Sequence, residues 1–420
     1  MKTLHSRWLI FWILALQYLF VYFHRVCPAV VAPELVNTFQ ISGTSLGVLA
    51  SGYFYSYAIM QIPAGLLSDS WGARKTVTLL GFIAAIGAIL FGLAPTFGFA
   101  TLSRIIVGFG VSATFVCSLK VIAEWYHGRE YARTMGLFMA IGGIGWLSAS
   151  TPLAILTQNF GWRAAFILTG AITVVLTILT WLIVVDSPNK KAVPAPDDTA
   201  IMPRESGRRF FAGIVSVLKD KHFRAIAIWL FFAEGTLFSF FGLWAGPYLL
   251  DTFGMTKTGA GNILSMVAAG MVFGGPFLGY LSDKIVVSRK KVLVGASICN
   301  VIIWVIMAAF YNVIPVPALY AIFFVMGVTT SSIIVIAITN VKELFPLQIA
   351  GTAIGTANLF SFFGGIVFQP LIGYILDSAG KIGDAYPPSA YRKALLVFLF
   401  INCLALIVSF FTKETLKKTA

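Results

Sequence analysis

The stretch GLLSDSWGARK at residues 65–75 has a close copy in the second half of the chain, GYLSDKIVVSRK at residues 279–290. The two copies begin 214 residues apart. A second pair of segments, AEWYHGREYARTMG at 123–136 and KELFPLQIAGTAIG at 342–355, aligns without gaps at an offset of 219 residues. Because the two offsets agree, the sequence predicts that the chain consists of two duplicated halves of similar length.

The composition places both halves in a membrane. Of the 420 residues, 58% are hydrophobic and 11% are charged, and the mean hydropathy is +0.88. Apolar segments of about twenty residues recur along the chain, and each is long enough to cross a hydrocarbon layer of roughly 30 Å as a helix. We expect twelve membrane-spanning helices, at residues 8–31, 46–67, 76–95, 98–123, 133–157, 164–185, 223–250, 260–281, 291–311, 316–340, 347–376 and 391–412.

The net charge of +14 is concentrated in alternate loops between these spans. Of the 30 Lys and Arg residues, 22 fall on the side that carries both chain ends, five fall on the opposite side, and Arg25, Arg104 and Lys120 fall within spans. Basic loops are retained in the cytoplasm. The charge bias therefore predicts a multi-pass protein of the cell inner membrane with both termini in the cytoplasm, and it indicates a lipid partner rather than a nucleic acid.

The longest polar stretch, residues 187–222, is rich in Pro and charge and predicts a cytoplasmic linker. It separates two predicted six-helix bundles, residues 1–186 and 223–420, so the expected fold class is an all-α membrane protein. The first apolar segment is longer than the core of a signal peptide, roughly 7–15 residues, and lacks a clear cleavage site, so we expect a retained helix. The four cysteines are far apart and predict neither disulfides nor a metal site.

These motifs resemble those of the major facilitator superfamily of secondary transporters over essentially the whole chain. The pattern GxxxDxxGxRK at 65–75 matches the superfamily's loop between helices 2 and 3, and RxxxGxG at 104–110 is similar to its fourth-helix motif. The segments YFHRV at 22–26, RIIVGFGVSATFVCSLKVIAEWY at 104–126 and FGWRAAF at 160–166 look most like the organic anion/proton symporter group. In that group the helix-1 arginine contacts the substrate anion, so the resemblance implies this role for Arg25.

The chain departs from the pattern of that group at two positions. His24 stands where the group often has an acidic residue, and Val111 stands where it has a glutamate. The proton-coupling residues of the group therefore do not carry over to this chain. The fifth span, GLFMAIGGIGW at 136–146, lacks the Gly-Pro pair of antiporters, which favours symport.

Arg25 is the strongest candidate for substrate binding on physical grounds as well. A guanidinium within a span costs roughly several kcal/mol, and Tyr18, Tyr22 and Arg25 recur at helical spacing, so two phenols share its face. The planar fork of arginine suits a carboxylate or a phosphate. The alternative is an arginine that extends along its helix to the outer interface. Polar residues of other spans complete the predicted binding set: Tyr53, Tyr57, Lys120 and Asn358.

Glu234 lies among apolar residues about eleven positions into the seventh span. Burial favours the protonated form of a carboxyl group, so we predict that Glu234, together with the titratable His24, carries the coupled proton. The alternatives for Glu234 are a permanently neutral acid and a ligand for the amine of a zwitterion. Charged residues of the repeated loops and of the fourth span are predicted to gate the cytoplasmic side: Asp69, Arg74, Lys75, Arg104, Asp283 and Arg289.

The sequence thus predicts a monomeric secondary transporter that imports a small carboxylate- or phosphate-bearing metabolite with a proton, by alternating access. No cofactor or metal is expected. Two alternatives stay open, which are symport of an amino acid or short peptide and export of drugs or siderophores. An enzyme is disfavoured, because the sequence shows no Ser/His/Asp, clustered Cys/His or phosphate-loop pattern.

Overall fold

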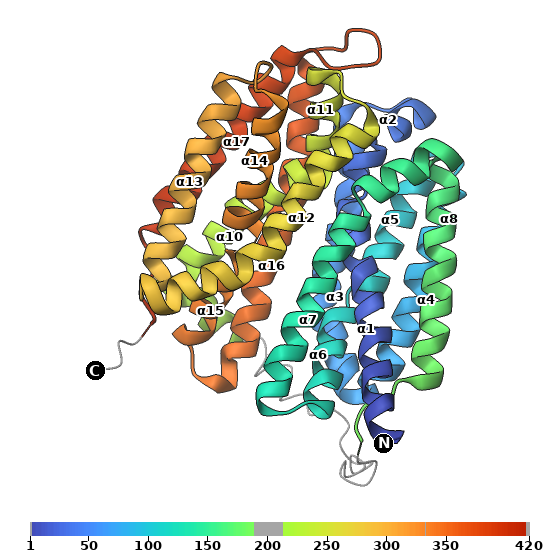
Figure 1. The fold of residues 1–420 in the computed structure, drawn as a ribbon, viewed down its shortest axis with the longest axis vertical. Helices are drawn as coiled ribbons and strands as arrows, with labels where there is room; N and C mark the ends of the chain where they lie inside the picture. The colour runs from blue at the N-terminus through green and yellow to red at the C-terminus, as the bar shows by residue number, and fades with distance from the viewer. Residues whose placement is uncertain (1, 189–212, 332, 417–420) are drawn as a thin grey trace.

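The computed structural model describes residues 2–188, 213–331 and 333–416. Within these ranges the regular secondary structure is helical, apart from an isolated bridge between Ile382 and Ala385. Figure 1 shows two bundles that come together at one end of the molecule and diverge toward the other. We call the converging end, with residues 37–43, 254–257 and 380–387, the far end. The end with residues 66–75 and 342–347, where α1 begins and α17 stops, is the terminal end.

The first half contains six crossings built from eight helices. Its first crossing is broken before Pro28, because proline has no N–H for the helical hydrogen bond. A turn at Gly161, with a φ of 79°, divides α8 between the fifth and sixth crossings. The helices are α1 (Lys2–Val26), α2 (Pro28–Phe39), α3 (Gly43–Trp71), α4 (Ala73–Gly92), α5 (Phe97–Val111), α6 (Thr114–Trp125), α7 (Gly128–Ser148) and α8 (Thr151–Ile183).

The second half repeats this plan, with three π-helical turns inside its crossings. The seventh crossing is α10 (Lys221–Ser239), η1 (Phe240–Trp244) and α11 (Ala245–Phe253); the eighth is α12 (Lys257–Tyr280) and η2 (Leu281–Ile285); the ninth is α13 (Arg289–Ala309). The tenth is α14 (Val316–Met326), η3 (Gly327–Ser331) and α15 (Ile334–Leu344); the last two are α16 (Leu347–Ser378) and α17 (Pro388–Ser409). The twelve predicted crossings are therefore confirmed.

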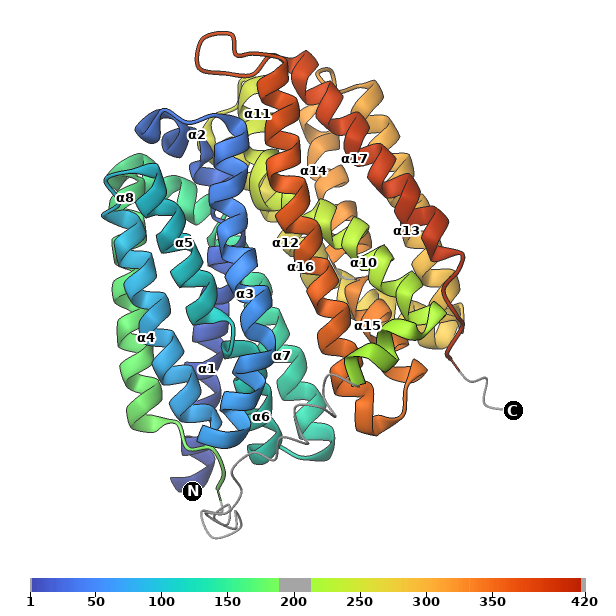
Figure 2. The ribbon, with the colours of Figure 1, turned by 180° about the vertical axis from the view of Figure 1, so that it is seen from behind.

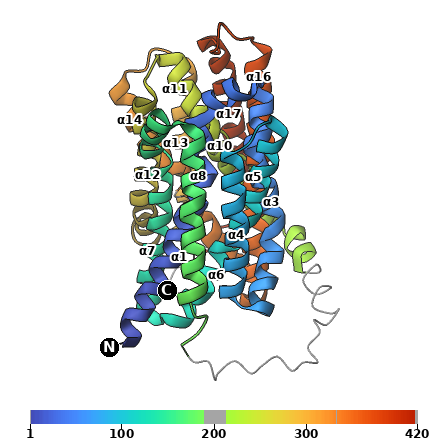
Figure 3. The same ribbon diagram turned by 90° about the vertical axis from the view of Figure 1, so that its right-hand side faces the viewer.

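Length and apolar composition alone identify ten segments of the described chain that are able to cross a membrane. One of them, Arg133–Ile183, contains the turn at Gly161 and so holds two crossings. The 29-residue α3 is not among the ten and supplies the remaining one. In Figure 3 the helices α1, α4, α5 and α8 of the first half run along the long axis of the molecule.

The structure describes only part of the predicted linker, residues 187–222. Residues 189–212 lie outside the described chain, but residues 213–219 are helical, and Val217 is fully buried in a cluster with Phe223 and Ile226 of α10. Burial of the apolar side chain of Val217 packs this short segment against the second bundle. The second bundle therefore begins before residue 223.

The apolar clusters show where the two halves meet. One cluster contains residues of both halves, whereas two others each belong to one half and lie at the terminal end. Between the halves α3 packs against α16, and Figure 2 shows these two helices meeting above and diverging below. The described residues of the basic loops lie at the terminal end; that this end faces the cytoplasm remains the prediction of the charge bias.

Candidate substrate site and gates

Arg25 lies one residue before the end of α1, at the interface between the halves, and is 7% exposed. Four aromatic rings surround its guanidinium. The guanidinium carbon is 4.7 Å from the ring centroid of Tyr22 and 5.2 Å from that of Tyr57, both in the first half. From the second half it is 5.5 Å from Phe238 of α10 and 5.3 Å from Phe362 of α16. Within the described chain no acid forms an ion pair with Arg25, and its Nε has no hydrogen-bond partner.

Tyr53 belongs to the same site. Its ring stacks on that of Tyr57 at 5.6 Å, and its hydroxyl donates to the carbonyl oxygen of Val21 at 3.1 Å. The ring of Tyr57 in turn lies 5.2 Å from the guanidinium carbon of Arg25. The structure therefore brings together Arg25, Tyr22, Tyr53 and Tyr57, as the sequence predicted.

Polar side chains lie on the terminal side of this aromatic layer. Each of the three neighbouring helices carries a polar residue four positions from the ring that it contributes, and residues four apart share a helix face. Glu234 is 2% exposed, and its Oε1 has no hydrogen-bond partner; the same is true of the amide nitrogen of Gln61. The three pairs are Tyr57 with Gln61, Phe238 with Glu234, and Phe362 with Asn358.

Arg25 and Glu234 face the same region from opposite halves. Glu234 lies one helical turn from Phe238, whose ring contacts Arg25, yet the described chain forms no ion pair between Glu234 and Arg25. A buried cation and a buried acid that have no ion-pair partner in the described chain are costly in an apolar interior. This arrangement is suited to an anion that binds Arg25 and to a proton that neutralises Glu234.

His24 faces away from Arg25. Its ring lies against those of Phe20, Phe23 and Phe166, and neither ring nitrogen has a partner among the described residues. The structure gives His24 no acid or substrate-facing position, so its proton-coupling role stays a prediction without geometric support.

Arg104 completes the break between α1 and α2. Proline at position 28 leaves the carbonyl of His24 without its helical donor, and the Nη2 of Arg104 donates to this oxygen at 2.8 Å. Its Nη1 lies 3.7 Å from the sulfur of Cys27. The predicted gating residue is therefore placed within the first half, where it fixes the backbone next to Arg25.

We expect Arg104→Ala to lower the free energy of unfolding by about 1.5–3 kcal/mol, because a buried carbonyl loses a charged donor. Thermal unfolding of the purified protein in detergent measures the change. Arg163→Ala is the matched control, because Arg163 also donates to backbone carbonyls, those of Gly92 and Ala94, at the far end of the same half. If Arg104→Ala weakens acid binding and Arg163→Ala does not, the loss of Arg104 affects Arg25. An unchanged stability of the Arg104→Ala protein contradicts the hydrogen bond from Arg104 to His24.

Two other residues of the predicted binding set are held by contacts within the first half. Lys120 donates to the carbonyl of Ser68 at 3.0 Å, near the terminal end of α3 and about 16 Å along that helix from Tyr57. Tyr18 is buried in the first half, stacked on Phe138 at 4.4 Å. The ring of Tyr18 also lies 5.4 Å from that of Tyr22 and so borders the site at Arg25, whereas Lys120 lies away from this site.

The charged residues of the repeated loops are held within their own halves. Arg289 pairs with Asp283 and lies 3.4 Å from the Oε1 of Glu343. Arg74 stacks over the ring of Trp181 at 4.5 Å, and Lys75 is exposed. The side chain of Asp69 lies outside the described part of the structure. The gating roles of these residues remain predictions.

An acid from the end of each half caps the helix that follows its repeated loop. Asp186 accepts from the backbone N–H of Arg74 at 2.6 Å, at the start of α4. Glu414 accepts from the N–H of Arg289 at 3.0 Å and from Ser288, at the start of α13. Although partial burial acts the other way, these hydrogen bonds hold the pKa of Glu414 below its ordinary value. The matching caps support the duplication of the two halves.

A capping contact between the halves was not predicted from the sequence. Asp377, near the end of α16, accepts from the N–H of Gly43 at 2.7 Å and from the N–H and hydroxyl of Thr44 at 2.8 and 2.6 Å. It thereby caps the N-terminus of α3, in the other half. The shared order GxxxD, at Gly65 to Asp69 and at Gly373 to Asp377, was the available signal.

Tyr386 adds a fourth hydrogen bond to the same carboxylate. Its hydroxyl donates to Asp377 at 2.5 Å. Burial and the neighbouring carboxylate raise the pKa of Tyr386, so the phenol remains a donor at physiological pH. We call these contacts of Asp377 with Gly43, Thr44 and Tyr386 the far-end latch.

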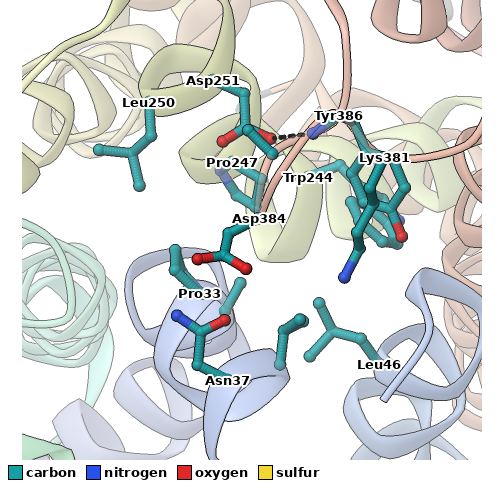
Figure 4. Close-up of a pocket in the computed structure, with 13 residues that line it drawn as sticks. Pro33, Asn37, Leu46, Trp244, Pro247, Leu250, Asp251, Lys381, Asp384 and Tyr386 are labelled. Atoms are coloured by element: carbon teal, nitrogen blue, oxygen red, sulfur yellow. Dashed lines mark hydrogen bonds between the residues drawn. The ribbon is translucent and has the colours of Figure 1, made fainter. Parts of the chain in front are cut away.

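Other polar contacts cross between the halves at the same end. Lys257 pairs with Glu34, and its Nζ donates to the hydroxyl of Thr157 at 2.9 Å. Beside the latch lies a hollow of about 200 Å³ that both halves line, with Asn37 on one side and Lys381 on the other. Figure 4 shows these side chains around the hollow. The far end is therefore closed by direct contact between the halves.

At the terminal end the halves are apart. A Cβ on Gly143 of α7 would lie 2.7 Å from Val272 of α12, so the helices touch at this level. Seven residues nearer the terminal end, on the same face, a Cβ on Gly136 would meet no described atom within 4 Å. The same holds for Gly275 and Gly279, which follow Val272 along α12. The structure is therefore closed at the far end and open at the terminal end.

Two duplicated bundles around a buried, unpaired charge define a membrane transporter. The sequence profile described as "Major Facilitator Superfamily" matches residues 14–256 and 235–420. The chain belongs to this superfamily, and the predicted two-bundle fold is confirmed.

Relatives and solved structures agree with this assignment. The chain is 25% identical to the "Probable galactarate/D-glucarate transporter GarP" of Escherichia coli strain K12, over 95% of each chain. It is 25% identical to the "Probable sulfoacetate transporter SauU" of Cupriavidus necator, over 97% of this chain and 96% of that one. The crystal structure of a D-xylose-proton symporter superposes with a TM-score of 0.77 at 17% identity, over 98% and 99% of the two chains.

Proposed function

We propose that this protein imports a small organic acid together with a proton, by alternating access of its two bundles. The observation that carries the proposal is the unpaired Arg25 at the interface of the halves, with an unpartnered carboxylate oxygen of Glu234 across from it. The names of the relatives, which refer to sugar diacids and to sulfoacetate, support an organic anion as the substrate.

Arg25 binds the acid group of the substrate. A guanidinium presents paired N–H donors in the geometry of a carboxylate, phosphate or sulfonate, and such bonds are strong where water is excluded. Tyr22 and Tyr57 flank the guanidinium and orient it. Gln61 and Asn358, on the terminal side, are placed for polar groups of the substrate body.

Glu234 carries the proton. In its protonated form it leaves the positive charge of Arg25 available to the substrate, and in its ionised form it competes with the substrate for Arg25 across the interface. Proton release to the cytoplasm therefore promotes release of the acid. The described state, closed at the far end and open at the terminal end, fits the release step of an importer whose terminal end is cytoplasmic.

Uptake into proteoliposomes under an imposed pH gradient tests the proposal. Galactarate, glucarate, sulfoacetate, a sugar phosphate and a monocarboxylate serve as labelled substrates. We expect accumulation of at least one acid when the outside is more acidic, and none when the gradient is collapsed by a protonophore. Failure of every acid to accumulate or to exchange overturns the proposal.

We expect Glu234→Gln to abolish pH-driven accumulation while acid exchange between the two sides continues. The amide keeps the shape and the hydrogen bonds of a neutral carboxyl but carries no proton through the cycle. Counterflow and pH-driven uptake are measured on the same proteoliposomes. Glu343→Gln is the control, because this acid contacts Arg289 at the terminal end, away from the site. Accumulation by the Glu234→Gln protein contradicts the assigned role.

A zwitterionic substrate is the second candidate, because Arg25 and Glu234 lie on opposite halves and present opposite charges. An amino acid or short peptide would bind its carboxylate at Arg25 and its amine at Glu234. The same Glu234→Gln protein separates the two cases. Loss of binding at every pH supports the zwitterion, whereas retained exchange supports the proton carrier.

A further inference from the structure

The proposed function leaves unexplained why half of the aromatic rings around Arg25 come from the other bundle. Tyr22 contacts only rings of the first half among those described, Tyr18 and Trp146. Phe362, in contrast, packs on Tyr57 at 4.7 Å and on Phe54 at 6.1 Å across the interface. When the halves move apart, Tyr22 therefore keeps its ring contacts, whereas Phe362 loses its contacts with Tyr57 and Phe54.

Phe238 and Phe362 form one unit. Their rings stack at 5.7 Å with an interplanar angle of 12°, and Phe238 also lies 5.0 Å from Phe54. The carbonyl of Phe238 accepts from the side chain of Gln369 at 3.0 Å, which fixes α10 to α16 at this level. A Cβ on Gly365 would lie 3.2 Å from the Cβ of Phe238, so the backbones are also close. The pair is a rigid surface that the second half presents to Arg25.

The charge of Arg25 makes this contact sensitive to the substrate. A cation is attracted to the face of an aromatic ring, and the attraction is larger where water is excluded. When an anion neutralises the guanidinium, the attraction weakens. Opening of the far end carries Arg25 away from Phe238 and Phe362 but leaves Tyr22 in place, because Tyr22 lies on the same helix.

We propose that Phe238 and Phe362 are positioning residues for Arg25, supplied by the second half, which tie the empty site to the closed far end through their contact with the unneutralised guanidinium. The inference rests on the proposed role of Arg25. It adds that the charge, and not only the packing of the rings, stabilises the closed state, and that substrate binding removes this contribution.

Spin labels at Asn37 and Lys381 test the inference without substrate. Both residues are exposed at the far end and lie in opposite halves. Pulsed electron paramagnetic resonance gives the populations of short and long distances. We expect Phe362→Leu to shift the empty protein toward the long distance by roughly 2- to 30-fold, the range that cation–π contacts span from exposed to desolvated sites. Phe362→Tyr, which keeps the ring, leaves the populations unchanged.

Two controls separate charge from packing. Tyr22→Leu removes a ring at a similar distance from Arg25 within the first half, so we expect no shift. In an Arg25→Met background, Phe362→Leu must lose most of its effect, because the charge that it contacts is gone. If Phe362→Leu shifts the populations equally with and without Arg25, or not at all, the inference is overturned. The proposed function is judged separately, by acid uptake of the native protein.

Discussion

Replacement of Arg25 by Ala is expected to reduce acid uptake at least 30-fold. Loss of one partner of a desolvated charge pair costs about 2–5 kcal/mol of binding free energy, and each 1.4 kcal/mol is roughly a factor of ten. Arg25→Lys keeps the positive charge but not the planar fork, so we expect an intermediate loss. Initial rates in proteoliposomes, together with acid-induced thermal stabilisation of the purified variants, measure the effect.

The stability of the empty Arg25→Ala protein provides an internal check. Arg25 is a buried cation without an ion-pair partner in the described chain, so its removal relieves a desolvation cost. Because its contacts with four aromatic rings are lost at the same time, we expect a melting temperature close to that of the native protein. A variant that unfolds more easily and also fails to transport would assign Arg25 to the structure rather than to the substrate.

Replacement of Asp377 by Ala is expected to open the far end. The carboxylate accepts three hydrogen bonds from Gly43 and Thr44 of the other half. Even two such bonds, at about 1.5 kcal/mol each for a charged acceptor, amount to a population shift on the order of 100-fold. The distance between labels at Asn37 and Lys381 should lengthen, and acid uptake should slow because the protein returns less often to the state open at the terminal end.

Asp251 offers a matched control for this experiment. Its carboxylate accepts from the N–H of Tyr386 at 3.2 Å and from the hydroxyl of Tyr391 at 2.7 Å, all within the second half. Asp251→Ala therefore disturbs the same loop without removing a contact between the halves. We expect the label distance to stay short. Equal lengthening in both variants would show that general loosening of the second half, and not loss of the far-end latch, opens the structure.

The sequence by itself determined the architecture and the central charge. Apolar segments of membrane length, a basic bias of 22 to 5 and two repeats with agreeing offsets allow little other than twelve helices in two halves. Arg25 was predictable for the same reason, because a guanidinium in an apolar segment is expensive unless it has a function. Helical spacing also predicts that Tyr22 lies on the same helix face as Arg25. It likewise predicts that Tyr53 and Tyr57, four positions apart, share a face of their helix.

Only the tertiary structure decided which residues meet across the halves. Phe238 and Phe362 look like lipid-facing bulk in the sequence, and Asp377 looks like a surface acid at a helix end; each acquires its role from a partner hundreds of residues away. Helical periodicity fixes a direction within one helix but carries no information on the packing between helices. For this reason the sequence predicts a binding role for Lys120 and a proton-coupling role for His24, whereas packing within the first half places Lys120 on Ser68 and His24 against Phe166.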